Sequence, residues 1–562
     1  MIRNSEQLLL ARMLGWVALV ATVFVVPWAS FDPINVPKLA VISIGGIMVL
    51  IIAATQWKAI CAGEFRLPIL IVITFIIDLV LVLFLTGNNF NQEFYGTFGR
   101  ATGFVAYVSL AGLLLAGIIS ASSYSLKHFS WFLIAAGALS SLYGVLQALG
   151  ADPVKWINSY SPVIGFLGNP NFQSSFVAFS AILAFAILIR QSSARIKAGL
   201  TVFLVFAIFV IYKTQSQQGI VVLVGGIAVV IFLFVNKSKA KKFTFPLLGA
   251  GCAGALLAIM GSLNKGPLAA ILFEESVTYR GDYWRAGWKM TVNNPIFGIG
   301  LDNYGDWYRR SRTLEATLRR GPEVVSNAAH NVLLDFSSGG GFPLAILYLA
   351  LMFLVLIAAI RVIRRSSNFD PYFSGLFAVW VAYQAQSLIS LNQLGLAVWG
   401  WIISGLIIGW EIYSRSPENE IRAVGPSKSI KRTAAKNNQQ LLPSTSLAIF
   451  VGLLIGSLVG VPPLLASSKF KSAIESGNAS VIMNSAKSFP QDGYRSVQVA
   501  YILHQNKLDA QALPVILEAT QKYPDVFDGW KILAILTTAT PAQVSEAKSQ
   551  MKRLDPYNPD LK

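Results

Sequence analysis

Residues 217–236 read QQGIVVLVGGIAVVIFLFVN, and the basic run KSKAKK follows directly at 237–242. An α-helix needs roughly 20 apolar residues to cross the hydrocarbon core of a bilayer. Similar stretches, rich in Leu, Ile, Val, Phe, Ala and Gly, recur along the chain. Of its 562 residues, 54% are hydrophobic and 13% are charged, whereas about a quarter of a soluble protein is charged. The sequence therefore predicts an all-α, polytopic helical membrane protein rather than a soluble protein with many buried helices.

About thirteen spans are expected. They lie near 10–29, 37–56, 67–87, 101–120, 129–149, 171–190, 198–213, 217–236, 243–262, 341–361, 372–391, 395–413 and 446–466. The first stretch is basic and then apolar, and it lacks a clear small-residue cleavage site. It is therefore expected to be an uncleaved first span and not a removed signal peptide.

The basic residues indicate the topology. The formal net charge is +18, which by itself could suggest a nucleic-acid partner. Here the Lys and Arg residues gather in alternate loops, and short cytoplasmic loops collect such residues. These loops carry Lys58 and Arg66, Lys127, Arg190, Arg195 and Lys197, Lys237, Lys239, Lys241 and Lys242, and Arg361, Arg364 and Arg365. We therefore expect a cytoplasmic N-terminus, an external C-terminus and no nucleic-acid partner.

On this topology the longest loop, at about 263–340, lies outside. It is rich in arginine: Arg280, Arg285, Arg309, Arg310, Arg312, Arg319 and Arg320. Two explanations fit the cluster at 309–320. It is either a solvated amphipathic helix with ion pairs inside the loop, or a site for an anionic partner, because the planar guanidinium suits phosphate oxygens.

Two polar segments complete the domain organisation. Residues 1–413 form the expected membrane domain, 414–445 a basic cytoplasmic linker that can lie on anionic headgroups, and 446–466 the last span. Residues 467–562 form an external tail of short helical segments separated by Pro, Gly, Asp and Asn. The tail loosely resembles tetratricopeptide helix pairs, with a small bundle packed on the membrane domain as the alternative. In either case it is expected to dock, with a protein partner as one option.

Cysteine and metal chemistry are not indicated. The two cysteines, Cys61 and Cys252, fall at different spans, so neither a disulfide framework nor a cysteine-based metal site is expected. The large loop shows no ligand cluster beyond Glu274, Glu275 and Asp282. No cofactor is expected.

Of the three histidines, His330 lies where the large loop meets the next span, in SNAAHNVLLDFSSGGGF. A histidine at a membrane edge can titrate near neutral pH and act as a general base, although position alone favours an interfacial histidine with no chemical role. Upstream, Gly298 and Gly300 in NPIFGIG would let the backbone turn tightly.

Three further polar residues are placed at the outer membrane edge. Asn169 and Asn171 lie in GFLGNPNFQ, where a span begins after an external loop. Arg100 enters a span in YGTFGRATGF, where the alternative to a functional role is a snorkelling anchor.

The order of these elements resembles the O-antigen ligase and polymerase superfamily over roughly residues 95–410. GNPNF comes first, then Thr214, Ser216 and Gly219 at a span start, then R-x-x-x-W with NPIFGIG, then AHNVLLDF. The AHN element before an apolar helix, with the P-x-x-G-x-G turn upstream, is the most specific part.

The resemblance implies a metal-independent glycosyltransferase of the bacterial cytoplasmic membrane with a GT-C-like helical fold. Such proteins move a glycan from undecaprenyl diphosphate to an acceptor hydroxyl on the outer face. The implied base is His330, and the implied contact with the diphosphate is Arg280, with Arg285 as a weaker candidate.

The chain departs from the family pattern at one place. Many members have Ser-Arg-Gly at the start of the middle span, and the arginine is taken to meet the diphosphate. Here KTQSQQG places Gln217 or Gln218 there, and neither carries a charge. Gln218 is retained as a substrate-binding candidate, and Lys213 or Arg100 could supply the missing charge.

Other functions remain open. A flippase for lipid-linked oligosaccharides would share the many spans, but inverted repeats and charges within spans would be expected there. A membrane anchor that recruits partners through its tail would leave the AHN and arginine elements unexplained. Within the transferase class, the acceptor could be lipid A core, another repeat unit or a protein hydroxyl.

Overall fold

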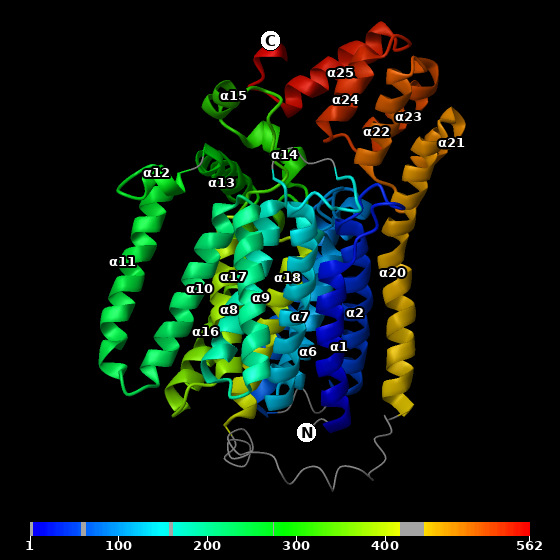
Figure 1. The fold of residues 1–562 in the computed structure, drawn as a ribbon. Helices are drawn as coiled ribbons and strands as arrows, with labels where there is room; N and C mark the ends of the chain where they lie inside the picture. Colours follow the sequence, from blue (N-terminus) through cyan, green and yellow to red (C-terminus); the bar gives the residue numbers. More distant parts are fainter. Residues whose placement is uncertain (1–3, 58–62, 157–160, 274, 416–442, 562) are drawn as a thin grey trace.

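The computed structural model describes residues 4–57, 63–156, 161–273, 275–415 and 443–561 (Figure 1). Within these ranges all regular structure is helical, and no strand is formed. The prediction of an all-α polytopic protein is confirmed.

A bundle of long helices makes up the body of the molecule. Its members are α1 (Asn4–Val23), α2 (Asn35–Thr55), α4 (Arg66–Leu85), α6 (Phe104–Ser120), α7 (Ser123–Ala148), α8 (Pro170–Arg190), α9 (Ala194–Lys213), α10 (Gln217–Asn236), α11 (Thr244–Ser262), α16 (Val332–Arg365), α17 (Pro371–Ser387), α18 (Leu394–Tyr413) and α20 (Pro443–Ser476). Of the described helices, 11 are long and apolar enough to cross a membrane. The two others at predicted spans, α6 and α17, each have 17 residues, about the least that can cross.

Shorter elements lie between and beyond these helices. They are η1 (Gly63–Phe65), α5 (Phe90–Tyr95), η2 (Gly165–Leu167), η3 (Lys241–Phe243), α12 (Ala269–Leu272), α13 (Glu275–Asn293), α14 (Tyr304–Ser311), α15 (Leu314–Arg320), α21 (Ala479–Ser485), α22 (Gly493–Gln505), α23 (Asp509–Lys522), α24 (Phe527–Ile535), α25 (Pro541–Leu554) and η4 (Pro559–Leu561). Helices α12–α15 belong to the long predicted loop, and α21–α25 belong to the tail.

Some predicted boundaries were wrong. The first helix ends at Val23 and not at 29, because the chain turns around Pro27. The last helix continues past the predicted end at 466 to Ser476, so the predicted tail begins inside it. Residues 416–442 of the predicted linker, and Cys61, lie outside the described residues.

The core of the bundle is centred on α18, which is buried along almost its whole length. Trp399 and Trp401 on this helix are among the largest fully buried side chains. Small residues allow other helices to approach closely. In α20, Gly452, Gly456 and Gly460 face α2, where an added Cβ at each would press on that helix. Such small-residue contacts are typical of helix pairs in membranes.

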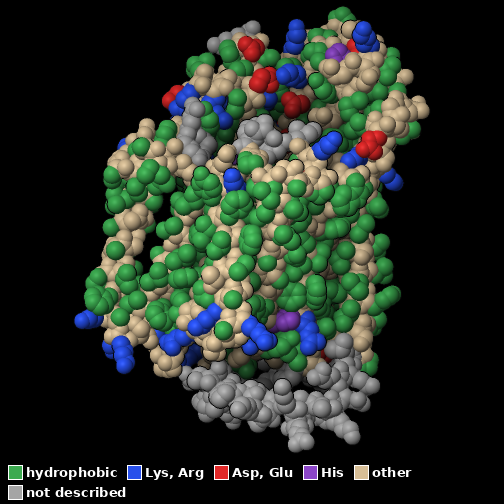
Figure 2. All heavy atoms as spheres, in the orientation of Figure 1, with side chains coloured by type: hydrophobic (Ala, Val, Ile, Leu, Met, Phe, Trp, Pro, Cys, Tyr) green, Lys and Arg blue, Asp and Glu red, His purple; other side chains and the backbone are tan. Residues whose placement is uncertain are grey.

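The bundle has two distinct ends (Figure 1). We call the end that bears α12–α15 and the tail helices the loop end; the N-terminus lies at the opposite end. Figure 2 shows Lys and Arg side chains along the lower edge of the bundle, and we call this the basic end. Between the two ends the surface is mostly hydrophobic, as expected for contact with lipid.

Helix α11 stands apart from the other helices (Figure 1). Nearly all of it is exposed, including Phe245, Leu256 and Ile259. It joins α10 at the basic end and leads back to α12 at the loop end. A surface of this kind suits lipid contact on most sides.

Candidate active site

The predicted tight turn packs against a break in α16. Gly298 and Gly300 have φ of 64° and 91°, which confirms that this turn needs glycine. The amide of Ile299 donates to the carbonyl of Ser338 at 2.8 Å, and that of Phe342 donates to Pro295 at 2.8 Å. Gly341, with φ of 72°, interrupts α16 at this contact.

This junction holds the segment that carries His330. The backbone of His330 is left-handed, with φ of 55°, an uncommon conformation for a residue with a side chain. Asn331 follows as the N-cap of α16, and its side chain accepts from the amide of Leu334. On the other side, the amide of Ala329 donates to Asp335 at 2.8 Å. Strained backbone of this kind persists only where its surroundings fix it, and it gathers at functional sites.

The imidazole of His330 is half-buried between the loop and the start of α16. Its Nδ1 lies 3.2 Å from the carbonyl oxygen of Ala328, and its ring centre lies 5.3 Å from that of Tyr283. A carbonyl can only accept, so this contact assigns the proton to Nδ1. The lone pair of Nε2 then remains available to receive a proton.

The charge state of His330 follows from its surroundings. Its pKa is lowered to about 4, chiefly by burial, and the positive charges of Arg100, Arg280 and Arg320 act in the same direction. The imidazole is therefore neutral at physiological pH. An anion bound beside these arginines would offset their effect and raise the pKa toward the range in which histidine is an effective base.

Arg100 lies in a buried ion pair. Its Nε is 3.1 Å from Asp302, and its Nη1 donates to the carbonyl of Asn327 at 3.2 Å. Asp302 also accepts from the amides of Thr97 and Thr102. The guanidinium is thus neither a snorkelling anchor nor open toward lipid.

A cavity of about 20 Å³ adjoins this pair, lined in part by Tyr304 and Asp335. It is large enough for about one water molecule. One oxygen of Asp335 is buried without a hydrogen-bond partner among the described residues. A water molecule in this cavity could donate a hydrogen bond to that oxygen, which would satisfy it.

A larger pocket brings three of the predicted site residues together. It has a volume of about 210 Å³ and is lined by Arg280 of α13, Asn171 of α8 and Gln218 of α10. Gln217 and Gln386 add further polar groups to it. The remaining walls are mostly apolar: Val221, Val222, Gly225, Gly226, Leu272, Val277, Val381, Ala382, Ala385 and Ile389. The pocket thus combines one arginine and several side-chain amides with apolar walls. Such a lining suits a ligand with an anionic head and an apolar chain.

The amides in this region also have structural partners. Asn169 caps α8 by accepting from the amide of Asn171 at 2.9 Å. Asn171 accepts from the hydroxyl of Ser216 at 2.7 Å, and Gln218 donates to Ser175 at 3.2 Å. Asn169 does not line the pocket.

Arg285 is not brought to the pocket. Its side chain is 62% exposed, and Nη1 lies 3.8 Å from Asp282 on the same helix. The pair is therefore exposed on the arginine side and contributes little to stability.

The arginines at 309–320 have partners within the protein. Arg312 donates to Asp555 of the tail at 2.7 Å, and Arg309 lies 3.2 Å from the same carboxylate. Arg310 pairs with Asp525 of the tail at 3.0 Å. Arg319 pairs with Asp282 at 2.7 Å. The alternative of ion pairing within the loop holds for Arg319, while the other three bind the tail, which sequence reasoning did not anticipate.

Sequence reasoning also missed four residues of this region: Asp302, Asp335, Tyr283 and Tyr304. Tyr304 donates its hydroxyl to the carbonyl of Tyr283 at 2.6 Å, which holds α14 to α13. Asp335 stands in the AHNVLLDF element and Asp302 in GIGLDNYGDWY. The signal that could have identified Asp302 and Asp335 is that each is a carboxylate within a largely apolar motif.

Metal ligands do not gather anywhere in the part of the chain that the structure describes. No group of three or more His, Cys, Asp or Glu residues there could hold a metal ion.

The segment that contributes α9, α10, the loop helices and the first part of α16 matches a known family. Residues 202–349 match the family model described as O-antigen ligase. This segment is thus similar to the O-antigen ligase family. No curated protein matches the chain. The family implies glycosyl transfer in surface polysaccharide assembly, with a lipid-linked glycan donor and a glycan acceptor.

The matched segment contains most of the candidate site residues. Gln218, Arg280, Arg285 and His330 fall within the matched residues. Arg100, Asn169 and Asn171 precede them and join the site only through the fold.

Proposed function

We propose that this protein transfers a glycan from undecaprenyl diphosphate to an acceptor hydroxyl at the loop end of the bundle. The observation that carries the proposal is the placement of Arg280 in the 210 Å³ pocket, together with its charge acting on His330. The site thus combines a cation for the leaving group with a neutral imidazole for the attacking hydroxyl.

In the proposed reaction, the acceptor oxygen attacks the anomeric carbon of the donor glycan. The new glycosidic bond forms as the bond from that carbon to the diphosphate oxygen breaks. The hydroxyl proton passes to Nε2 of His330, and the bonding electrons leave with the undecaprenyl diphosphate. Arg280 stabilises the charge that develops on the leaving group, an effect worth about 3–4 kcal/mol for one key donor.

The apolar part of the pocket supports a lipid-linked donor. Its walls come from α10 and α17, next to the exposed helix α11, so an isoprenoid chain can lie against the lipid-facing side. The glycan would extend from the diphosphate toward His330, where α13–α15 cover the bundle.

We further propose that the loop end faces the outside of the bacterial cytoplasmic membrane. Lys127 near the start of α7, Lys237 after α10 and Arg365 at the end of α16 line one pocket at the basic end, and short cytoplasmic loops favour such residues. The N-terminus lies at that same end (Figure 1).

The decisive experiment is glycan transfer by His330→Ala in proteoliposomes that contain one undecaprenyl-diphosphate-linked glycan. We expect the rate to fall by about 10²–10⁴-fold, as for the loss of a general base, while the protein still inserts. The control is His128→Ala, at the opposite end of the bundle, which should keep the wild-type rate. Wild-type transfer by His330→Ala would rule out its role as the base.

Arg280 is tested by donor binding. Arg280→Ala should weaken binding of the lipid diphosphate by about tenfold or more, since a hydrogen bond to a charged group is worth about 1.5–3 kcal/mol. The matched control is Lys289→Ala, which removes an exposed cation from the same helix. Equal donor affinity of the two variants would exclude Arg280 as the diphosphate contact.

A further inference from the structure

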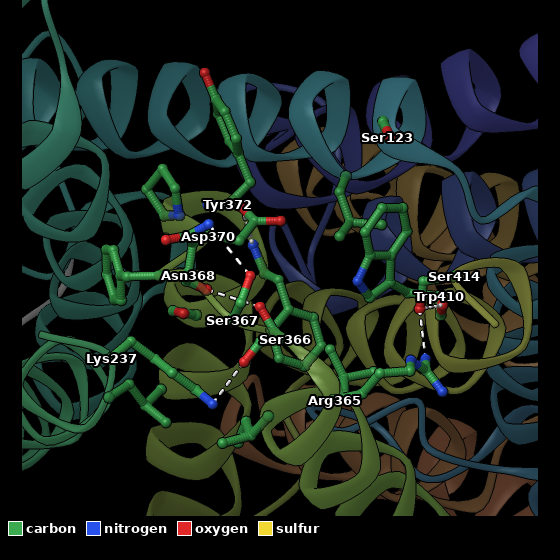
Figure 3. Close-up of a pocket in the computed structure, with 18 of the residues that line it drawn as sticks. Ser123, Lys237, Arg365, Ser366, Ser367, Asn368, Asp370, Tyr372, Trp410 and Ser414 are labelled. Atoms are coloured by element: carbon green, nitrogen blue, oxygen red, sulfur yellow. Dashed lines mark hydrogen bonds between the residues drawn. The ribbon is translucent and has the colours of Figure 1, made fainter. Parts of the chain in front are cut away.

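A cavity with a partly polar lining lies at the basic end, far from the candidate active site (Figure 3). Its volume is about 460 Å³, within the range of pockets that hold small ligands. The ends of α10, α16 and α18 and the starts of α7 and α17 surround it. Three cations line it, Lys127, Lys237 and Arg365, with Asp370 as the only acidic lining residue.

Lys237 is the cation that points into this pocket without an acidic partner. Its Nζ donates to the carbonyl of Ser366 at 2.7 Å (Figure 3). Lys237 takes part in no ion pair among the described residues, and partial burial lowers its pKa. An ammonium has three N–H donors, so two remain for a ligand.

The other charged groups are largely engaged. Arg365 lies 3.5 Å from Glu411 and donates to the hydroxyl of Ser414 at 2.7 Å. Asp370 serves as the cap of α17, where one oxygen accepts from the amides of Tyr372 and Phe373. Lys127 is exposed at the rim. The positive charge left to attract a ligand therefore comes from Lys237 and Lys127.

The walls add an apolar contribution. Leu126, Leu233, Val362, Ile363 and Trp410 line the pocket beside the polar loop. Leu126 lies in the first turn of α7, and the other four lie in the last turns of α10, α16 and α18. A ligand that meets both linings has an anionic head and an apolar portion.

We propose that this pocket binds a phosphate ester, with Lys237 and Lys127 contacting the phosphate oxygens. The apolar walls favour the headgroup of an anionic membrane lipid as the source, and such lipids are abundant in the cytoplasmic leaflet. A soluble phosphate ester would satisfy the same cations. The site does not depend on the glycan-transfer reaction, which lies at the other end of the bundle.

The test measures binding to the purified full-length chain in detergent, with three probes. Dioleoyl phosphatidic acid carries the phosphate, dioleoylglycerol has the same chains without it, and inorganic phosphate represents the soluble source. We expect phosphatidic acid to bind at least tenfold more tightly than dioleoylglycerol. Lys237→Gln should weaken its binding about tenfold, whereas Lys237→Arg should restore it.

The matched control is Lys239→Gln, which removes the same charge from an exposed position two residues away and should leave binding unchanged. Binding of inorganic phosphate that Lys237→Gln abolishes would support the site and assign it to a soluble ester. Equal binding of phosphatidic acid to wild type, Lys237→Gln and Lys127→Gln would overturn the proposal, as would equal binding of dioleoylglycerol. If Lys237→Gln fails to fold, Lys127→Gln and Lys237→Arg carry the test.

Discussion

His330 stays neutral over a wider range of pH than an exposed histidine, because burial and three arginines disfavour its imidazolium. A pKa near 4 makes it a weak base in the free protein. A bound diphosphate would neutralise the neighbouring arginines and so raise the pKa of His330. The base and the leaving-group site are therefore coupled electrostatically.

This coupling predicts the pH dependence of transfer. We expect kcat/KM, which reports the free protein, to show no fall near pH 6.5 and to decline only as the pH approaches about 4. Arg320→Gln removes one of the cations, so the acid limb should move to higher pH. The rate is measured from pH 4 to 8; an acid limb at 6.5 in wild type would contradict the buried, neutral histidine.

The same shift has a consequence for stability with a definite sign. Between pH 6.5 and about 4 the unfolded chain binds a proton at His330 that the folded chain does not bind. The contribution of the neutral His330 to the free energy of unfolding is therefore fully present above pH 6.5 and is lost as the pH falls toward 4.

At the scale of elements, the break in α16 sets the geometry of the site. Hydrogen bonds tie the NPIFGIG turn to residues 338–342, and the short first part of α16 then presents Asn331 and His330 to the loop. The apolar pattern predicted a span from 341, which is where the second part of α16 begins. The helical turns from Val332 to Gly340 were not predicted, because their Ser and Gly residues make the segment too polar for an apolar span.

Gly341 tests this arrangement. A Cβ there would collide with the backbone of Pro295 and Ile296, and φ is 72°. We expect Gly341→Ala to destabilise the fold by more than about 1 kcal/mol, measured by thermal unfolding in one detergent. The control Gly251→Ala, on the exposed helix α11, meets nothing within 4 Å. A similar melting temperature for both variants would show that the break tolerates a side chain.

At the scale of the whole molecule, the tail is fastened both to the large loop and to the connection between α5 and α6. Asp555 is fully buried between Arg309 and Arg312 of the loop, and Phe98 of the connection stacks on Tyr494 of the tail with ring centres 4.4 Å apart. The tail helix α25 thereby lies against α14 at the loop end (Figure 1). This contact accounts for arginines that would otherwise suggest a phosphate site.

Removing Asp555 should release the tail. Asp555→Ala leaves the buried guanidinium of Arg312 without its carboxylate and leaves Arg309 with only Glu323 at 3.7 Å, and breaking a buried pair costs about 3–5 kcal/mol. Hydrogen exchange of α14 and α25 should then rise. Asp560→Ala, an exposed change in the same segment, is the control, and unchanged exchange in Asp555→Ala would show that the ion pairs do not hold the tail.

The sequence by itself determined the membrane class, the position of the spans, the large loop and the tight glycine turn. Each of these depends on residues near one another in the chain, whose hydropathy and backbone freedom act locally. Tertiary structure alone decided the partners of the charged groups. Arg312 and Asp555 are 243 residues apart in sequence, and only packing brings them together. For the same reason the sequence could name His330 and Arg280 as candidates, whereas the pairing of Arg100 with Asp302 and the pocket that joins Arg280 to Asn171 and Gln218 required the fold.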